Sequence, residues 1–403
     1  MTASRRLSGC LVLALLLSPA LRAAAEEAPY AWVQHVDGGR MEVRAAVSGP
    51  ACPPLAVDGV PFTMGVRTGD GAADAPGEFG VTVCAAVLPA GARRAAVAGH
   101  SLPVPARPPT RIAVLGDTGC RTPIEDCTST WALPAVAEAI AARHPDLIIH
   151  LGDYLYRERG CLGDTCGYGW LPWRADFMDV AAARLFPVAP LLLVRGNHES
   201  CKRAAKGWFL LFDPMPAPAR CEAVTPAWSV DIGTANLVIV DASSADDGVA
   251  SNVAAYRRAF DAARLSTDKP NWMIAHKPLW AVDSVGRWLN ATLQEAVGER
   301  VVPGRWGLVL SGHVHTTEVI QMKGRPPQFV LGNGGADLVP TPSGPPLVGT
   351  SAAGATVTAA YTRSGYGFAL LEQERGQWQV SLIDAGNRVV ARCDLAGRCV
   401  AAP

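Results

Sequence analysis

Five short apolar runs of the chain each end in side chains that can bind a metal ion or transfer a proton. The runs cover residues 111–115, 147–151, 190–194, 271–275 and 307–311. Apolar runs of this length, with turn residues after them, are typical of strands buried in the middle of a sheet. One strand-terminal histidine is usually structural, but here half of the eight histidines stand at such ends. The pattern predicts a sheet whose strand ends gather reactive side chains at one edge.

A segment of helical character joins the first two runs. Residues 132–143 carry apolar side chains at the spacing of one helix face. Strand, helix and strand in this order form a βαβ unit, whose right-handed crossover returns the chain parallel to the first strand. We therefore expect Asp117 and Asp153, which follow the two strands, to lie at the same edge of the sheet.

The polar side chains at these ends are oxygen and nitrogen donors suited to Zn²⁺, Mn²⁺ or iron. Seven candidates are too many for one tetrahedral ion but fit two ions that share a bridge: Asp117, Asp153, Tyr156, Asn197, His276, His313 and His315. Asp153 is the candidate bridge. Two ions about 3.5–4 Å apart stabilise both oxygens of an in-line displacement and deprotonate a bound water near neutral pH. The set predicts hydrolysis of a phosphate ester by a metal-bound hydroxide.

In order and spacing, these blocks resemble those of the calcineurin-like metallophosphoesterases. The similar blocks are Gly116-Asp117, Gly152-Asp153 with Tyr156, Gly196-Asn197-His198-Glu199, His276 and Gly312-His313-Val314-His315. The resemblance implies an α/β fold, a four-layer αββα sandwich. Where the broad superfamily has a histidine after the first aspartate and another aspartate after the second, this chain has Gly119 and Tyr156. In that pair it is similar to the purple acid phosphatases.

The resemblance to purple acid phosphatases implies a role for each residue. The Fe(III) site would consist of Asp117, Tyr156 and His315. The site of a divalent ion, Fe, Zn or Mn, would consist of Asn197, His276 and His313. Asp153 would bridge the two ions, and His198 matches the histidine that hydrogen-bonds the phosphate or aids the leaving group. Plant-type members have further histidines after the block of His276, and residues 278–284 contain none, so the leaving-group acid is open.

Two cationic side chains beside these blocks are candidate substrate contacts. Arg195 precedes Gly196, and a guanidinium pairs bidentately with phosphate oxygens. Lys277 follows His276. For both residues the alternative is a structural ion pair.

Two segments near the blocks have the composition of loops. Residues 157–177 combine Cys161 and Cys166 with Trp170 and Trp173. Our hypothesis is that this tied aromatic loop forms one wall of a substrate cleft; the alternative is a plain surface loop. Residues 340–364, rich in glycine, proline and threonine, are expected to form a long loop.

The rest of the chain falls into three parts. Residues 1–25 have a basic start, an apolar run and small residues, which is the pattern of a secretory signal peptide. Residues 26–105 alternate as short strands do and predict a small β-sandwich-like domain, while 106–403 form the catalytic domain. We therefore expect a protein that is secreted or periplasmic after signal removal.

Ten cysteines remain when Cys10 leaves with the signal segment. An even number in an exported protein predicts disulfides, although connectivity stays open in principle. Neighbours in sequence give the simplest pairing: Cys52–Cys84, Cys120–Cys127, Cys161–Cys166, Cys201–Cys221 and Cys393–Cys399.

The formal net charge is +0, so nothing in the overall charge favours nucleic acid or an anionic membrane. The expected partner is a phosphate ester, and no membrane span is predicted. Our first hypothesis is that the protein hydrolyses phosphomonoesters. The alternative is a phosphodiesterase with the same binuclear site, and a second alternative is a non-catalytic binding protein on this fold.

Overall fold

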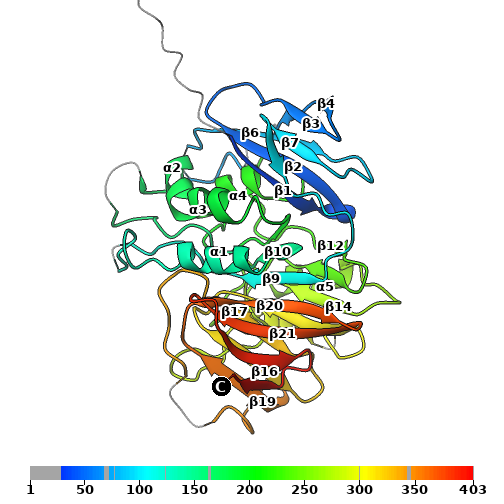
Figure 1. Cartoon of the computed structure of the whole chain (residues 1–403). Helices are drawn as coiled ribbons and strands as arrows, with labels where there is room; N and C mark the ends of the chain where they lie inside the picture. Colours follow the sequence, from blue (N-terminus) through cyan, green and yellow to red (C-terminus); the bar gives the residue numbers. More distant parts are fainter. Residues whose placement is uncertain are drawn as a thin grey trace, which may run out of the picture.

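The central strands are apolar on both faces, so they need a packed layer on each side. In β9 (Arg111–Leu115), Ala113 packs with the helices on one face, whereas Ile112 packs against a second sheet on the other. Ile149 of β10 (Leu147–His150) lies in that same inter-sheet core. In the computed structural model, which describes residues 29–67, 72–76, 78–122, 124–161, 165–298, 300–342 and 346–402, two large sheets therefore lie face to face (Figure 1).

The first large sheet carries β9 and β10 in its middle, as parallel neighbours. In spatial order it consists of β23 (Cys399–Ala401), β22 (Val389–Asp394), β21 (Gln377–Asp384), β20 (Gly367–Glu374), β9, β10, β11 (Leu191–Leu193), β1 (Tyr30–Val36), β2 (Arg40–Val47), β6 (Thr82–Val87) and β5 (Gly65–Val66).

The second large sheet faces it. In spatial order it consists of β12 (Trp228–Asp231), β13 (Asn236–Ile239), β14 (Asn271–Ile274), β15 (Trp306–Ser311), β17 (Gln328–Leu331), β16 (Thr317–Met322), β19 (Ala355–Arg363) and β18 (Ser351–Ala352). Strands β13, β14, β15 and β17 run parallel.

Helices cover the outer face of each large sheet. On the first sheet they are α1 (Leu133–Ala142), α2 (Trp170–Trp173), the π-helical turn η3 (Arg174–Met178), α3 (Asp179–Arg184) and α4 (Ala205–Leu211). On the second they are α5 (Val253–Ala262) and α6 (Ala291–Val297). The order helix, sheet, sheet, helix is the predicted four-layer α/β sandwich, and α1 lies where a helix over 132–143 was expected.

The N-terminal segment is β-rich, as expected. A short 3₁₀ turn, η1 (Asp37–Gly39), joins β1 to β2. A small sheet, in the order β4 (Val60–Phe62), β3 (Leu55–Val57), β7 (Ala95–Val97) and β8 (His100–Leu102), packs on β1, β2 and β6 around a separate apolar core. The structure adds that β1 pairs in parallel with β11, so this segment continues the first large sheet. A domain boundary near residue 105 stays a prediction.

All five predicted disulfides are present: Cys52–Cys84, Cys120–Cys127, Cys161–Cys166, Cys201–Cys221 and Cys393–Cys399. The predicted signal segment, 1–25, lies outside the described residues. Among the described helices, none has both the length and the apolar character that a membrane crossing needs.

The expectation of one long loop over residues 340–364 is wrong. Strands β18 and β19 lie there, and β19 pairs with β16 along most of its length. The composition suggested a loop because β19 is only partly buried and carries alanine and threonine rather than large apolar residues.

Candidate metal centre

The candidate ligands come from both large sheets and meet where their parallel strands end. Asp117, Asp153 and Asn197 follow β9, β10 and β11, which are neighbours in the first sheet. His276 and His313 follow β14 and β15, which are neighbours in the second. The residues that follow parallel strands lie at the same edge of a sheet, so stacking the two sheets brings the ligands of the first sheet close to those of the second.

The hydroxyl of Tyr156 is the centre of a first group of side chains. It lies 3.1 Å from Oδ1 of Asp117, 3.1 Å from Oδ2 of Asp153 and 2.9 Å from Nε2 of His315. Nε2 of His315 is also 3.4 Å from Oδ1 of Asp117. All four side chains are buried, with at most 6% of each residue exposed.

A second group shares Asp153 with the first. Oδ2 of Asp153 lies 3.3 Å from Nε2 of His276, which in turn lies 2.9 Å from Oδ1 of Asn197. One donor atom each of Asp153, His276 and His313 fall within 4.8 Å of one another. Oδ2 of Asp153 therefore stands between the two groups, where a bridging oxygen would have to be.

The backbone around these residues is strained or crowded, as is common at functional sites. Asp117, Asp153 and His313 have positive φ angles of 57°, 60° and 74°. The chain between Asp153 and Tyr156 is not helical. A Cβ on Gly119 would lie 2.6 Å from the carbonyl oxygen of Tyr154 and 2.7 Å from Cδ2 of Tyr156, so a side chain at 119 is excluded by this course of the loop and this position of the ring.

Each histidine has one ring nitrogen fixed by another group. Nδ1 of His276 donates to the carbonyl of Leu151 at 2.8 Å, and Nδ1 of His315 donates to that of Asp337 at 2.7 Å. Nε2 of His313 lies 3.0 Å from Oδ2 of Asp247. Such partners set the tautomer and leave the other nitrogen as a ligand, which is the usual arrangement around protein-bound metals.

Glu199 holds the loop that carries Asp153. Its carboxylate accepts backbone N–H groups of Asp153, Tyr154 and Gly196 at 3.0 Å each, and that of Leu155 at 3.3 Å. The residue is fully buried. Glu199 therefore ties the loop after β10 to the loop after β11 and fixes the backbone of the shared carboxylate.

The electrostatics of the site favour cations. Burial lowers the pKa of His276, but the charge of Asp153 outweighs it and raises that pKa to about 9. Burial likewise opposes protonation of His315, while Asp117 and Asp337 raise its pKa to about 10. Burial, together with Asp153 and Asp117, raises the pKa of Tyr156 well above its usual value. Two buried carboxylates thus create a negative potential that protons or metal ions must balance.

The residues fit a binuclear metal centre. The single proton of Tyr156 can satisfy only one of the two carboxylates beside it, so these buried oxygens depend on protonated His276 and His315 or on metal ions in their place. The donors are carboxylate, phenol, amide and imidazole groups, which suit iron, zinc or manganese.

His198 lies beside this centre. Its backbone N–H donates to Oδ1 of Asp153 at 2.8 Å, and its ring Nδ1 donates to the carbonyl of Leu155 at 2.9 Å. Nε2 lies 3.9 Å from Oδ2 of Asp153 and 3.0 Å from Nη2 of Arg203, whose guanidinium is paired with Glu158. Burial lowers the pKa of His198 to about 3, so its ring is neutral.

Arg195 is not placed as a substrate contact requires. Its Nε donates to the carbonyl of Glu199 at 2.9 Å, and its Nη1 lies 3.2 Å from Asp241. Its Nη2 lies against both sulfurs of the disulfide Cys201–Cys221. With only 2% of the residue exposed, Arg195 ties neighbouring loops together and has no donor left for a phosphate. The geometry supports the structural alternative.

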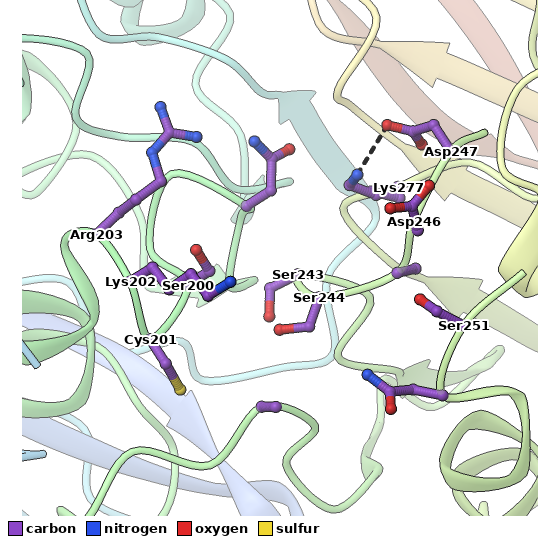
Figure 2. A pocket seen from close by; sticks show the side chains of 14 residues that line it. Ser200, Cys201, Lys202, Arg203, Ser243, Ser244, Asp246, Asp247, Ser251 and Lys277 are labelled. Atoms are coloured by element: carbon purple, nitrogen blue, oxygen red, sulfur yellow. Dashed lines mark hydrogen bonds and ion pairs between the residues drawn. The ribbon is translucent and has the colours of Figure 1, made fainter. Parts of the chain in front are cut away.

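Lys277 does reach a cavity beside the centre. This cavity, called the first cavity below, has a volume of about 520 Å³ and has Asn197, Arg203 and Lys277 in its wall. Nζ of Lys277 forms an ion pair with Asp247 at 2.9 Å, and Figure 2 shows this pair across the cavity from Arg203. Asp247 thus joins Lys277 to His313.

The tryptophans of the tied loop are not a cleft wall. Trp173 is fully buried and stacks on Tyr154, and Trp170 packs edge-on against Tyr30. Their large apolar surface is more stable in the helical layer than in a polar cleft. The same loop does line a second cavity, through Glu158 and Arg159.

Sequence reasoning missed several residues that contact the candidate ligands or His198: Arg121, Glu158, Arg203, Asp247 and Asp337. Each stands six or more residues beyond the end of a strand, so the pattern that found residues close to the strand ends gives no signal there. The pair Asp246-Asp247 was visible as two adjacent carboxylates, but nothing in sequence joins it to His313.

Comparison with known proteins agrees with this geometry. The sequence model described as calcineurin-like phosphoesterase matches residues 110–317. The structure is similar to that of the purple acid phosphatase PPD1 from seeds of yellow lupin (Lupinus luteus), with a TM-score of 0.62, 15% identity, and coverage of 90% of this chain and 73% of that one. No curated protein matches the sequence.

Two further solved structures are less similar. GAP50, the anchor in the inner membrane complex of Plasmodium, aligns with a TM-score of 0.45 and 13% identity over 72% of this chain and 90% of that one. A dimetal phosphatase from Danio rerio aligns with a TM-score of 0.38 and 12% identity over 72% of this chain and all of the other. The matched family model spans just over half of the chain and every candidate ligand, so this protein belongs to the calcineurin-like phosphoesterases and is a phosphoric ester hydrolase.

Proposed function

We propose that the chain is an exported phosphatase of purple acid phosphatase type, with one ferric and one divalent ion, that hydrolyses phosphomonoesters. The observation that carries the proposal is the position of the Tyr156 hydroxyl, 2.9–3.1 Å from Asp117, Asp153 and His315. A buried phenol with its pKa raised needs a strongly charged ion to become a phenolate, and Fe(III) is such an ion.

Two groups of side chains would hold the two ions. Asp117, Tyr156 and His315 would hold the ferric ion, and Asn197, His276 and His313 would hold the divalent ion. Asp153, whose Oδ2 lies between both groups, would be shared by them. Metal ions held there lower the pKa of a coordinated water and neutralise phosphate charge.

The protein's own residues orient the ester and supply one proton to it. His198 presents Nε2 beside the centre, because its Nδ1 is held by the carbonyl of Leu155. Its ring is neutral in the free protein, and an arriving phosphate dianion favours protonation at Nε2. The proton then stands next to the phosphate oxygens, where it can neutralise the departing oxygen. Lys277 adds a cation in the wall of the first cavity.

Five disulfides support export, because such bonds persist in oxidising compartments.

The test is the visible spectrum of the full chain supplied with iron and zinc, together with its hydrolysis of p-nitrophenyl phosphate and of bis(p-nitrophenyl) phosphate. We expect a purple band that is lost in Tyr156→Phe and kept in Tyr361→Phe, a change of the same kind on strand β19. The monoester should be the better substrate. Hydrolysis without any purple band would indicate a phosphoesterase that uses other metals. A higher activity on bis(p-nitrophenyl) phosphate than on the monoester would overturn the proposed substrate class.

A further inference from the structure

A second cavity, of about 560 Å³, opens beside the metal centre and shares only Arg203 with the lining of the first. Tyr156 and His198 belong to its wall, so it begins at the candidate ligands themselves. Its other charged lining residues are Arg121, Glu158, Arg159 and Arg203. Three arginines therefore face a single carboxylate.

Two of these arginines are already neutralised. Arg203 pairs with Glu158 through its Nη2 at 2.6 Å. Nε of Arg121 lies 3.2 Å from Oδ1 of Asp337, and its guanidinium lies over the ring of Tyr156. For Arg159, no ion pair is found among the residues that the structure describes. The cavity therefore carries one uncompensated positive charge, on an exposed side chain.

The first cavity lacks this excess. Of its three cations, Arg203 is paired with Glu158 and Lys277 with Asp247, and the third, Lys202, shares the wall with Asp246 (Figure 2). Both cavities touch the centre, through Asn197 in the first and through Tyr156 and His198 in the second. A substrate group with a negative charge is therefore stabilised more in the second cavity than in the first.

We propose that the second cavity binds the leaving group of the substrate and that Arg159 recognises an anionic group on it, a carboxylate or a second phosphate. The inference rests on the proposed phosphatase function and names its substrate class as phosphomonoesters whose leaving group is itself an anion. His198 lies in the wall of this cavity and also contacts Asp153 of the metal centre. Arg159 is an exposed residue of the same wall, on the loop after Tyr156, and its planar fork suits either oxyanion.

The probes are two esters of the same shape, 4-carboxyphenyl phosphate and 4-carbamoylphenyl phosphate, with the metal-loaded full chain. We expect the wild type to show a kcat/KM about fivefold higher for the carboxylate, the factor for two unit charges about 4 Å apart in water. In Arg159→Gln this ratio should fall to about one while hydrolysis of the carboxamide is unchanged. Arg258→Gln, which removes an exposed arginine from helix α5, should keep the wild-type ratio. Raising the salt concentration should lower the ratio in the wild type and in Arg258→Gln but not in Arg159→Gln.

The outcomes separate the two proposals. Hydrolysis of neither ester by the metal-loaded protein would contradict the phosphatase function itself. Equal rates for both esters in the wild type, or a preference that survives in Arg159→Gln, would overturn the subsite and leave the phosphatase intact. Esters of a phosphorylated phenol tell the two anions apart: a larger preference for that leaving group than for the carboxylate would assign the cavity to a second phosphate.

Discussion

Asp247 offers the sharpest test of how the divalent site is supported. Its Oδ2 accepts from Nε2 of His313 at 3.0 Å and from Nζ of Lys277 at 2.9 Å. Burial opposes the charge of Asp247, but His313 and Lys277 outweigh this and hold its pKa well below the usual value. In Asp247→Asn the shape is kept while the charge is lost, so His313 loses the anion that fixes its tautomer.

The size of the effect follows from the geometry. Removing the hydrogen-bond partner of a metal-binding histidine lowers metal affinity by roughly 10–100-fold, or about 1.4–2.7 kcal/mol. The side chain of Asp247 is 30% exposed, so water replaces part of the interaction. We therefore expect the lower end, about tenfold weaker binding of the divalent ion, with the ferric site unaffected.

The assay is competition with a chelator for the divalent ion, with the purple band as the measure of the ferric site. Asp246→Asn is the matched control, because it makes the same charge change one residue away, where the carboxylate accepts, among the described residues, only from N–H groups of its own turn. Wild-type affinity in Asp247→Asn, or an equal loss in both variants, would refute the role given to Asp247.

Three further predictions concern the support of the site. Glu199→Ala leaves four buried N–H groups without an acceptor and should lower the free energy of unfolding by roughly 4 kcal/mol or more. A denaturant titration measures this loss. A loss in Glu199→Ala no larger than that in Glu199→Gln would contradict the prediction. Gly119→Ala forces a Cβ against the Tyr154 carbonyl and the Tyr156 ring and should shift or abolish the purple band; an unchanged spectrum would contradict the exclusion of a side chain at this position. Because the pKa values of His276 and His315 are raised to about 9 and 10, their protonation stabilises the metal-free fold fully below about pH 6.5 and is lost as the pH rises through 9–10. Thermal unfolding of the metal-free protein should therefore occur at lower temperature at pH 9 than at pH 6.5, and metal binding at pH 7 should release protons; a flat pH profile and no proton release would count against these pairs.

The sequence determined the strands and the residues at their ends. Apolar runs such as 147–151 fold as buried strands wherever they pair, and the residue after each run then lies at the sheet edge. The pairing of cysteines was also readable, because near neighbours such as Cys161 and Cys166 are held close by the chain itself.

Only the tertiary structure decided which loops come to that edge and which charges are compensated. Arg195 and Arg159 look equally available in sequence, but packing surrounds one with carbonyls and sulfurs and leaves the other exposed beside a cavity. Asp247 meets His313 across 66 positions of sequence, and β1 joins β11 across more than 150. Such contacts depend on how two sheets stack and on where loops cross them, and the local chemistry of the chain carries no signal for either.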